Sequence, residues 1–119
     1  MKRPQFTFFQ GSTPTLVLAL PYPLSAQDVI YATFTQAYET VTEYTCGGEA
    51  FEPAPTGTMT PDVSCPYLLR ISMSQADTFL FASGECELQL RILKPDGRAD
   101  TLFPVRGYVG KARKEGVIE

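Results

Sequence analysis

The sequence predicts an all-β protein, a sandwich of about seven antiparallel strands with one short helical turn near residues 74–79. Ten prolines, nine glycines, eight Phe and six Tyr accompany only 19% charged residues, a composition that favours strands and turns over helices. Several segments alternate apolar and polar residues, most clearly ECELQLRIL at 85–93. Short strands of this kind bury their apolar faces by packing as two sheets, which is a β-sandwich.

Seven segments have the character of strands. The first is short and aromatic, and the second is a continuous apolar run between two prolines that we expect to be buried. The fourth has the Thr, Tyr and Glu content of a half-exposed strand near a sheet edge. Pro104 restricts the last segment to an edge or a bulge, because proline has no N–H for the ladder. The predicted strands span 5–10, 15–20, 28–36, 38–45, 67–73, 85–93 and 99–109.

Two connections have recognisable turn chemistry. Ser74 can cap a helical turn, with Asp77 three residues later completing a capping box. We expect Phe79 and Phe81 to face the core as the chain extends again. A compact turn here suits a chain that leaves one sheet and enters the other. KPDGR at 94–98 predicts a hairpin turn between the last two strands.

The chain has the length of one domain with a single hydrophobic core. We expect this domain to span 1–109 and a C-terminal tail, basic at Lys111, Arg113 and Lys114, to span 110–119. The segment 46–66 carries four prolines and three glycines, so we predict a long loop there, with room for a brief strand at 49–51. A loop of this length is either a mobile surface segment or a partner-contacting one, and both readings stay open.

Charge and hydropathy exclude several classes of protein. A net charge of −3 and a pI near 4.9 argue against nucleic-acid binding, which needs a basic surface. No run approaches the ~20 apolar residues of a membrane span. The N-terminal region begins like a secretory signal, but residues 10–14 interrupt its apolar part. The remaining run at 16–20 is shorter than the ~7–15 residues such a segment needs, so we expect no export by a signal peptide.

The three cysteines are an odd number without a CxxC pair. We expect free thiols in a reducing cytosol, and whether Cys46 and Cys65 pair stays an open alternative. The absence of histidine removes the commonest general base and the commonest metal ligand.

The remaining chemistry-bearing residues do not form a known motif. No GxGxxG or phosphate-binding loop is present. The carboxylate pairs Glu39/Glu43 and Glu85/Glu87 have the spacing of any solvated strand face, and Asp96 belongs to a turn rather than to a calcium loop. We therefore predict a protein that is not an enzyme, with no cofactor and no metal site.

A resemblance adds to this reading. FTFFQGSTPTLVL, LSAQDVIYATFTQ, ISMSQADTFLF, CELQLRILKPDGRA and KEGVI resemble segments of small prophage proteins of Gram-positive bacteria, most of them uncharacterised. The order of strands is similar to the N-terminal immunoglobulin-like domain of siphophage upper baseplate proteins. The resemblance implies an immunoglobulin-like antiparallel β-sandwich. The matching positions are Gln10, Gly11, Gln36, Gln75, Asp77, Thr78, Phe81, Gly84, Gln89, Arg91, Gly97 and 116–118.

For function, the resemblance implies a non-enzymatic virion structural or assembly protein of a phage or prophage, a tail or baseplate component. Its partners would be other phage structural proteins or copies of itself, met in the host cytoplasm during assembly and then in the virion. The alternative is a cell-surface or carbohydrate-binding β-sandwich module. An enzyme is a third reading, which would need a carboxyl group of raised pKa beside a second one. The candidate partner contacts are Tyr38, Tyr44, Phe51, Met59 and Tyr108.

Overall fold

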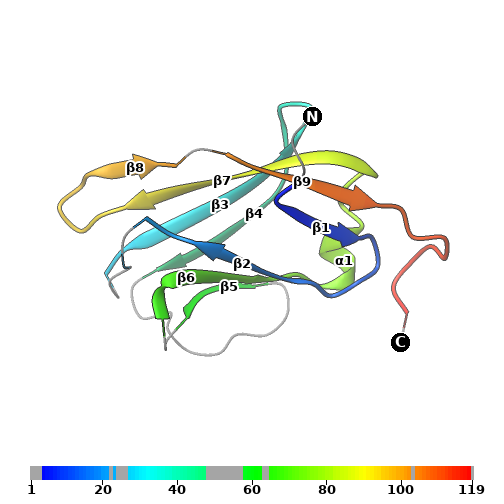
Figure 1. The fold of residues 1–119 in the computed structure, drawn as a ribbon, viewed down its shortest axis with the longest axis horizontal. Helices are drawn as coiled ribbons and strands as arrows, with labels where there is room; N and C mark the ends of the chain where they lie inside the picture. Colours follow the sequence, from blue (N-terminus) through cyan, green and yellow to red (C-terminus); the bar gives the residue numbers. More distant parts are fainter. Residues whose placement is uncertain are drawn as a thin grey trace.

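The computed structural model describes residues 4–21, 23, 27–47, 58–62, 65–102 and 104–118. These residues form two sheets and one helical turn (Figure 1). The larger sheet contains β1 (Phe6–Phe9), β3 (Val29–Gln36), β4 (Glu39–Gly47), β7 (Gly84–Leu93), β8 (Ala99–Thr101) and β9 (Val105–Gly110). The smaller sheet contains β2 (Thr15–Ala19), β5 (Thr58–Asp62) and β6 (Cys65–Ser72). The helical turn is α1 (Gln75–Thr78).

The strand order confirms the predicted immunoglobulin-like sandwich. The larger sheet runs β1-β9-β7-β3-β4 with β8 also paired to β7, and the smaller runs β2-β6-β5. In chain order these correspond to strands G, F, C and C′ of one immunoglobulin sheet (β9, β7, β3, β4) and to B, E and D of the other (β2, β6, β5). All neighbours are antiparallel except β1 and β9, which are parallel.

The core lies between the sheets and follows the alternation read from the sequence. Leu88, Leu90 and Ile92 of β7 point inward, while the residues between them face outward. Phe34 of β3 is fully buried, and Phe81 meets it edge-on with ring centroids 5.4 Å apart. Burial of each such side chain stabilises the fold by about 1.5–3 kcal/mol.

The long loop predicted over 46–66 is wrong in part. Residues 46 and 47 belong to β4, residues 65 and 66 belong to β6, and Thr58–Asp62 forms β5, which pairs with β6. Pro61 is tolerated in β5 because this strand is at the edge of its sheet and the register shifts at this point. The brief strand expected at 49–51 lies outside the described residues.

The second strand differs from its prediction. Leu16 of β2 is buried, but Val17 is 48% exposed. The apolar run suggested burial on both faces; instead β2 forms an edge of the smaller sheet and has one face toward solvent.

The last predicted strand is divided. β8 pairs with β7 through three residues, and after Pro104 the chain forms β9, which lies between β1 and β7. The missing N–H of Pro104 explains the break.

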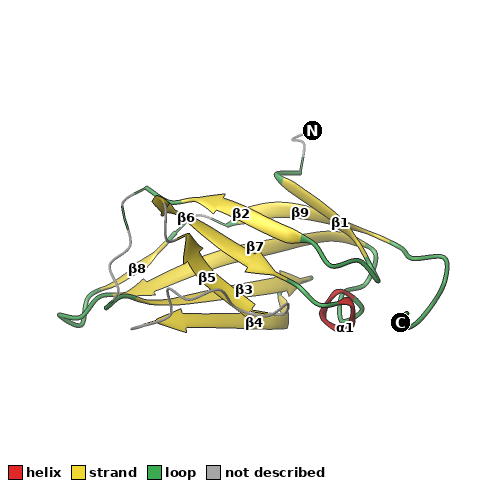
Figure 2. Cartoon of the chain, turned by 90° about the horizontal axis from the view of Figure 1, so that it is seen from below, coloured by secondary structure: helices red, strands yellow, loops and turns green. Residues whose placement is uncertain are grey.

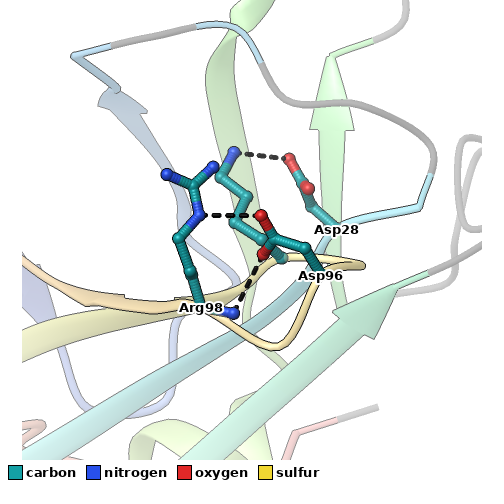
Figure 3. Close-up of polar contacts among 4 residues, drawn as sticks. Asp28, Asp96 and Arg98 are labelled. Atoms are coloured by element: carbon teal, nitrogen blue, oxygen red, sulfur yellow. Dashed lines mark hydrogen bonds and ion pairs between the residues drawn. The ribbon is translucent and has the colours of Figure 1, made fainter.

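The hairpin before β8 is confirmed, since Lys94 N donates to Arg98 O at 2.7 Å. Arg98 is held by Asp96 through its backbone N–H and its Nε, while Lys94 pairs with the buried Asp28 at 3.1 Å (Figure 3).

The helical turn makes the predicted crossing between the sheets, since α1 follows β6 and precedes β7. Ser74 caps it, accepting a hydrogen bond from Asp77 N at 3.1 Å. The carboxylate of Asp77 has a longer-range role, because its Oδ2 accepts a hydrogen bond from the hydroxyl of Tyr44 at 2.6 Å. Phe81 enters the core as expected, whereas Phe79 is half-buried.

Candidate functional site

The turn between β3 and β4 has an unusual backbone. Its two central residues, Ala37 and Tyr38, both have positive φ angles, 51° and 68°. A two-residue hairpin of this kind favours Asn-Gly, because side chains with a Cβ are strained in the left-handed region by about 1–2 kcal/mol each. The strain is retained at a position where the ring of Tyr38 is fully exposed. Strained backbone is concentrated at functional sites, so this turn is a candidate site.

Tyr38 lies at an open depression of ≈ 450 Å³ on the outer face of the larger sheet. Because side chains alternate along a strand, the outward positions of β7 and β9 flank the inward Cys86 and Gly107. Tyr108, which is 46% exposed, contributes the second aromatic ring. The other side chains that line the depression from outward positions belong to Thr35, Glu85, Glu87 and Arg106.

The depression is charged. Glu85 and Glu87 are two residues apart on one face of β7, and Arg106 of β9 is the register partner of Glu87. Within the described part of the chain, none of these three side chains forms an ion pair. The site therefore presents two carboxylates, one guanidinium and two phenol rings to solvent.

The structure places the predicted contact residues in different environments. Tyr38 and Tyr108, 70 residues apart in the chain, line the same depression. The prediction for Tyr44 is wrong: its side chain is 6% exposed and lies in the core, hydrogen-bonded to Asp77. Met59 lies on the edge strand β5, where its backbone pairs with Ile71, and Phe51 lies outside the described residues.

Sequence reasoning missed the role of three residues at this site. The sequence predicts only a solvated strand face at Glu85 and Glu87 and gives no role to Arg106. The available signal is the turn itself: a two-residue connection between two strands, without Gly or Asn, implies strain near Tyr38.

A second, smaller depression of ≈ 280 Å³ lies on the same sheet. Tyr31 lines it together with Arg91 and Glu43, and Glu43 accepts a hydrogen bond from Thr33 at 2.9 Å. Tyr31 and Tyr108 thus stand on the same sheet face but beside different hollows.

The residues that carry the sequence resemblance serve mainly as clamps on the backbone. Gln36 accepts from Ala82 N at 2.9 Å and donates to Ala82 O at 2.8 Å, so its amide pairs with one residue as a strand would. Gln75 does the same to Ile118, at 2.8 and 3.0 Å. Gln10 donates to Phe81 O at 2.7 Å. These three glutamines therefore hold loops in place through their side-chain amides.

The segment 111–118 is attached by two of these clamps. Ala112 N donates to Gln10 Oε1 at 3.3 Å, and Ile118 is held by Gln75 of α1. Figure 2 shows the C-terminus beside α1. The predicted tail has no helix or strand over 111–118, yet its backbone is bound to the domain at both ends.

Two cysteines are free and buried, Cys46 on β4 and Cys86 on β7. Burial raises the pKa of each thiol from 9.0 to about 11, with the charge of Glu87 adding to the effect at Cys86. A thiol of raised pKa is a poor nucleophile and metal ligand at neutral pH, so both act as small apolar core residues. The side chain of Cys65 lies outside the description.

Among the described residues, no group of three or more Cys, Asp or Glu side chains is placed to hold a metal ion. In that same part of the chain, no helix has the length and apolar character needed to cross a membrane.

Comparison with known proteins gives the fold. No protein-family profile matches the chain, and no curated protein sequence matches it. Among solved structures, the NK cell receptor NKp44 is similar over 93% of this chain and 100% of its own, with a TM-score of 0.56 and 17% identity. CopC from Methylosinus trichosporium OB3b is similar over 91% of this chain and 87% of its own, with a TM-score of 0.50 and 13% identity. The chain is therefore an immunoglobulin-like β-sandwich, and at these identities the likeness extends to the fold alone.

Proposed function

We propose that the protein is a non-enzymatic structural or assembly protein of a phage or prophage virion, a component of the tail or baseplate. It works through protein–protein contacts, in the host cytoplasm during assembly and afterwards in the particle. The resemblance of its sequence segments to small prophage proteins supports the assignment to a phage or prophage particle. The depression beside Tyr38 and Tyr108 supports the mode of action.

One observation carries the proposal. The turn at Ala37 and Tyr38 keeps two residues in a strained conformation and displays an exposed ring beside Tyr108 and Arg106. Tyr and Arg are enriched at the energetically important positions of protein interfaces. Tyr buries a large area with only two side-chain torsions, and the planar guanidinium of Arg can donate several hydrogen bonds at once. A rigid sandwich with clamped loops loses little conformational entropy on docking.

Particle fractionation tests this function. The full chain with a peptide tag is expressed in the strain that carries its gene, the prophage is induced, and particles are separated on a density gradient. We expect the tagged chain in the particle band, with a tagged cytoplasmic enzyme of similar abundance staying at the top. Absence of the chain from particles and from their assembly intermediates would contradict the proposal.

Carbohydrate binding is the second candidate. Aromatic rings flanked by carboxylates and a guanidinium can stack on a sugar ring and hydrogen-bond its hydroxyls, and Tyr38, Tyr108 and Arg106 supply such groups. Calorimetric titration with cell-wall oligosaccharides separates the two readings. Saturable binding that Tyr108→Ala removes would favour the sugar reading, and no heat at millimolar sugar would favour the protein contact.

A further inference from the structure

The depression beside Tyr38 has the chemistry of a site for cationic side chains. Glu85 and Glu87 supply two exposed carboxylates without an ion pair in the described structure. Tyr38 and Tyr108 supply aromatic faces beside them. A Lys or Arg side chain gains from both, through charge pairing with a carboxylate and through cation–π contact with a phenol ring.

The chain carries a matching cationic segment elsewhere. Lys111, Arg113 and Lys114 follow β9 and are all exposed, and none of them forms an ion pair within the described residues. The backbone of this segment is hydrogen-bonded to Gln10 at Ala112, and the chain after it is hydrogen-bonded to Gln75 at Ile118. Figure 1 shows the chain leaving the body of the domain after β9. Three positive charges thus lie exposed on a loop whose backbone is hydrogen-bonded to the domain at Ala112 and Ile118.

We infer that the depression of one copy binds the basic segment 111–114 of a second copy. The inference rests on the proposed function, because it names a self-association within the assembly. The two halves of the contact are different surfaces, so the contact is heterologous and can repeat from copy to copy, as in a ring. Arg106 is the register partner of Glu87, so its positive charge disfavours a second cation there and makes Glu85 the better acceptor.

A contact built on exposed charges is weak and sensitive to salt. Sedimentation velocity over a range of protein concentrations measures it. We expect the sedimentation coefficient of the wild-type chain to rise with concentration at low ionic strength. The association constant should fall at least about tenfold in 0.5 M NaCl, where the Debye length is only a few ångströms.

Charge exchange makes the test specific. Glu85→Lys/Glu87→Lys and Arg113→Glu/Lys114→Glu should each abolish self-association while keeping the thermal unfolding midpoint of the wild type. Mixing the two variants should restore association, because the basic depression of one then meets the acidic segment of the other. Failure of the mixture to associate while the wild type does would overturn the inference.

A further pair of variants distinguishes two basic segments that could occupy the depression. Residues 1–3, which include Lys2 and Arg3, precede Pro4 at the rim of the depression. If Lys2→Glu/Arg3→Glu abolished association and Arg113→Glu/Lys114→Glu did not, the occupant would be the N-terminal segment, and the inference would be wrong. A wild-type chain that stays monomeric at every concentration would also overturn it, while leaving the virion role to the fractionation experiment.

Discussion

The hydroxyl of Tyr44 donates a hydrogen bond of 2.6 Å to Oδ2 of Asp77 and so ties the edge strand β4 to the helical turn α1. Burial raises the pKa of Tyr44 above its usual value of 10.0, and the hydrogen bond and charge of Asp77 raise it further. The unfolded chain releases this proton near pH 10, whereas the folded chain keeps it. The stabilising contribution is therefore fully present below pH 10 and is lost as the pH rises above it.

Tyr44→Phe tests this relationship. At pH 7 the variant should lose about 1 kcal/mol of unfolding free energy, since the hydrogen bond is gone and the ring remains. Above pH 10 the difference between wild type and variant should shrink, because only the wild type has this proton to lose on unfolding. Urea unfolding at pH 7, 10 and 11 measures both effects, and a difference that stayed constant across this range would contradict the assignment.

Gln36 should matter for stability even though it is only half-buried. Its amide pairs with both backbone groups of Ala82, and its Nε2 also reaches Glu85 O at 3.2 Å. Gln36→Ala removes these bonds and should cost about 1–2 kcal/mol. Gln27→Ala, at an exposed loop position, is the control and should stay within about 0.5 kcal/mol of the wild type. Equal unfolding midpoints for the two variants would show that the clamp is not stabilising.

The parallel pairing of β1 with β9 depends on a glycine. Phe6 is opposite Gly107, and a Cβ on Gly107 would lie 2.1 Å from the Phe6 ring. Gly107→Ala must displace that ring and should cost about 1–3 kcal/mol, as overpacking does. In a Phe6→Ala background the same change should cost less, because the clash is gone. Thermal or chemical denaturation of the four proteins gives the coupling, and strictly additive effects would refute the clash.

The strained turn predicts a trade between stability and binding. Ala37→Asn/Tyr38→Gly gives the turn its preferred residues and should raise the unfolding free energy by about 1–2 kcal/mol. It should also weaken partner binding, because the ring is removed. Tyr38→Ala is the control, since it removes the ring but keeps a Cβ at positive φ; it should weaken binding without the gain in stability. A stabilised variant that bound as well as the wild type would show that the strain has no function here.

The sequence predicted those parts of the fold that local physics determines. Ser74 and Asp77 mark the helical turn through capping chemistry, and the alternation around Leu88 identifies the face of β7 toward the core. β5 could not be predicted, because it contains Pro61 and lies within the segment 46–66, whose prolines and glycines suggest a loop. Its stability comes from pairing with β6. Pairing across the chain is a tertiary effect that local propensity does not contain.

The candidate site was predicted only in part. Tyr38 and Tyr108 were singled out separately, but their proximity arises because β7 pairs with both β3 and β9. The many Thr and Glu residues of β4 obscure the alternation of apolar and polar positions. The sequence therefore does not show that Tyr44 points toward the core. Only the inward position of its ring beside Phe34, with centroids 5.9 Å apart, shows that it belongs to the core.

The most direct test of the depression as the contact surface is the amount of variant chain found in purified particles. Tyr38→Ala/Tyr108→Ala removes both rings at the depression, and Tyr31→Ala removes a matched ring from the other hollow of the same sheet. With folding verified by thermal denaturation, we expect the double variant to be at least about tenfold depleted, which corresponds to about 1.4 kcal/mol of lost binding, and Tyr31→Ala to be incorporated normally. Normal incorporation of the double variant, or equal depletion of both, would contradict the assignment of the site.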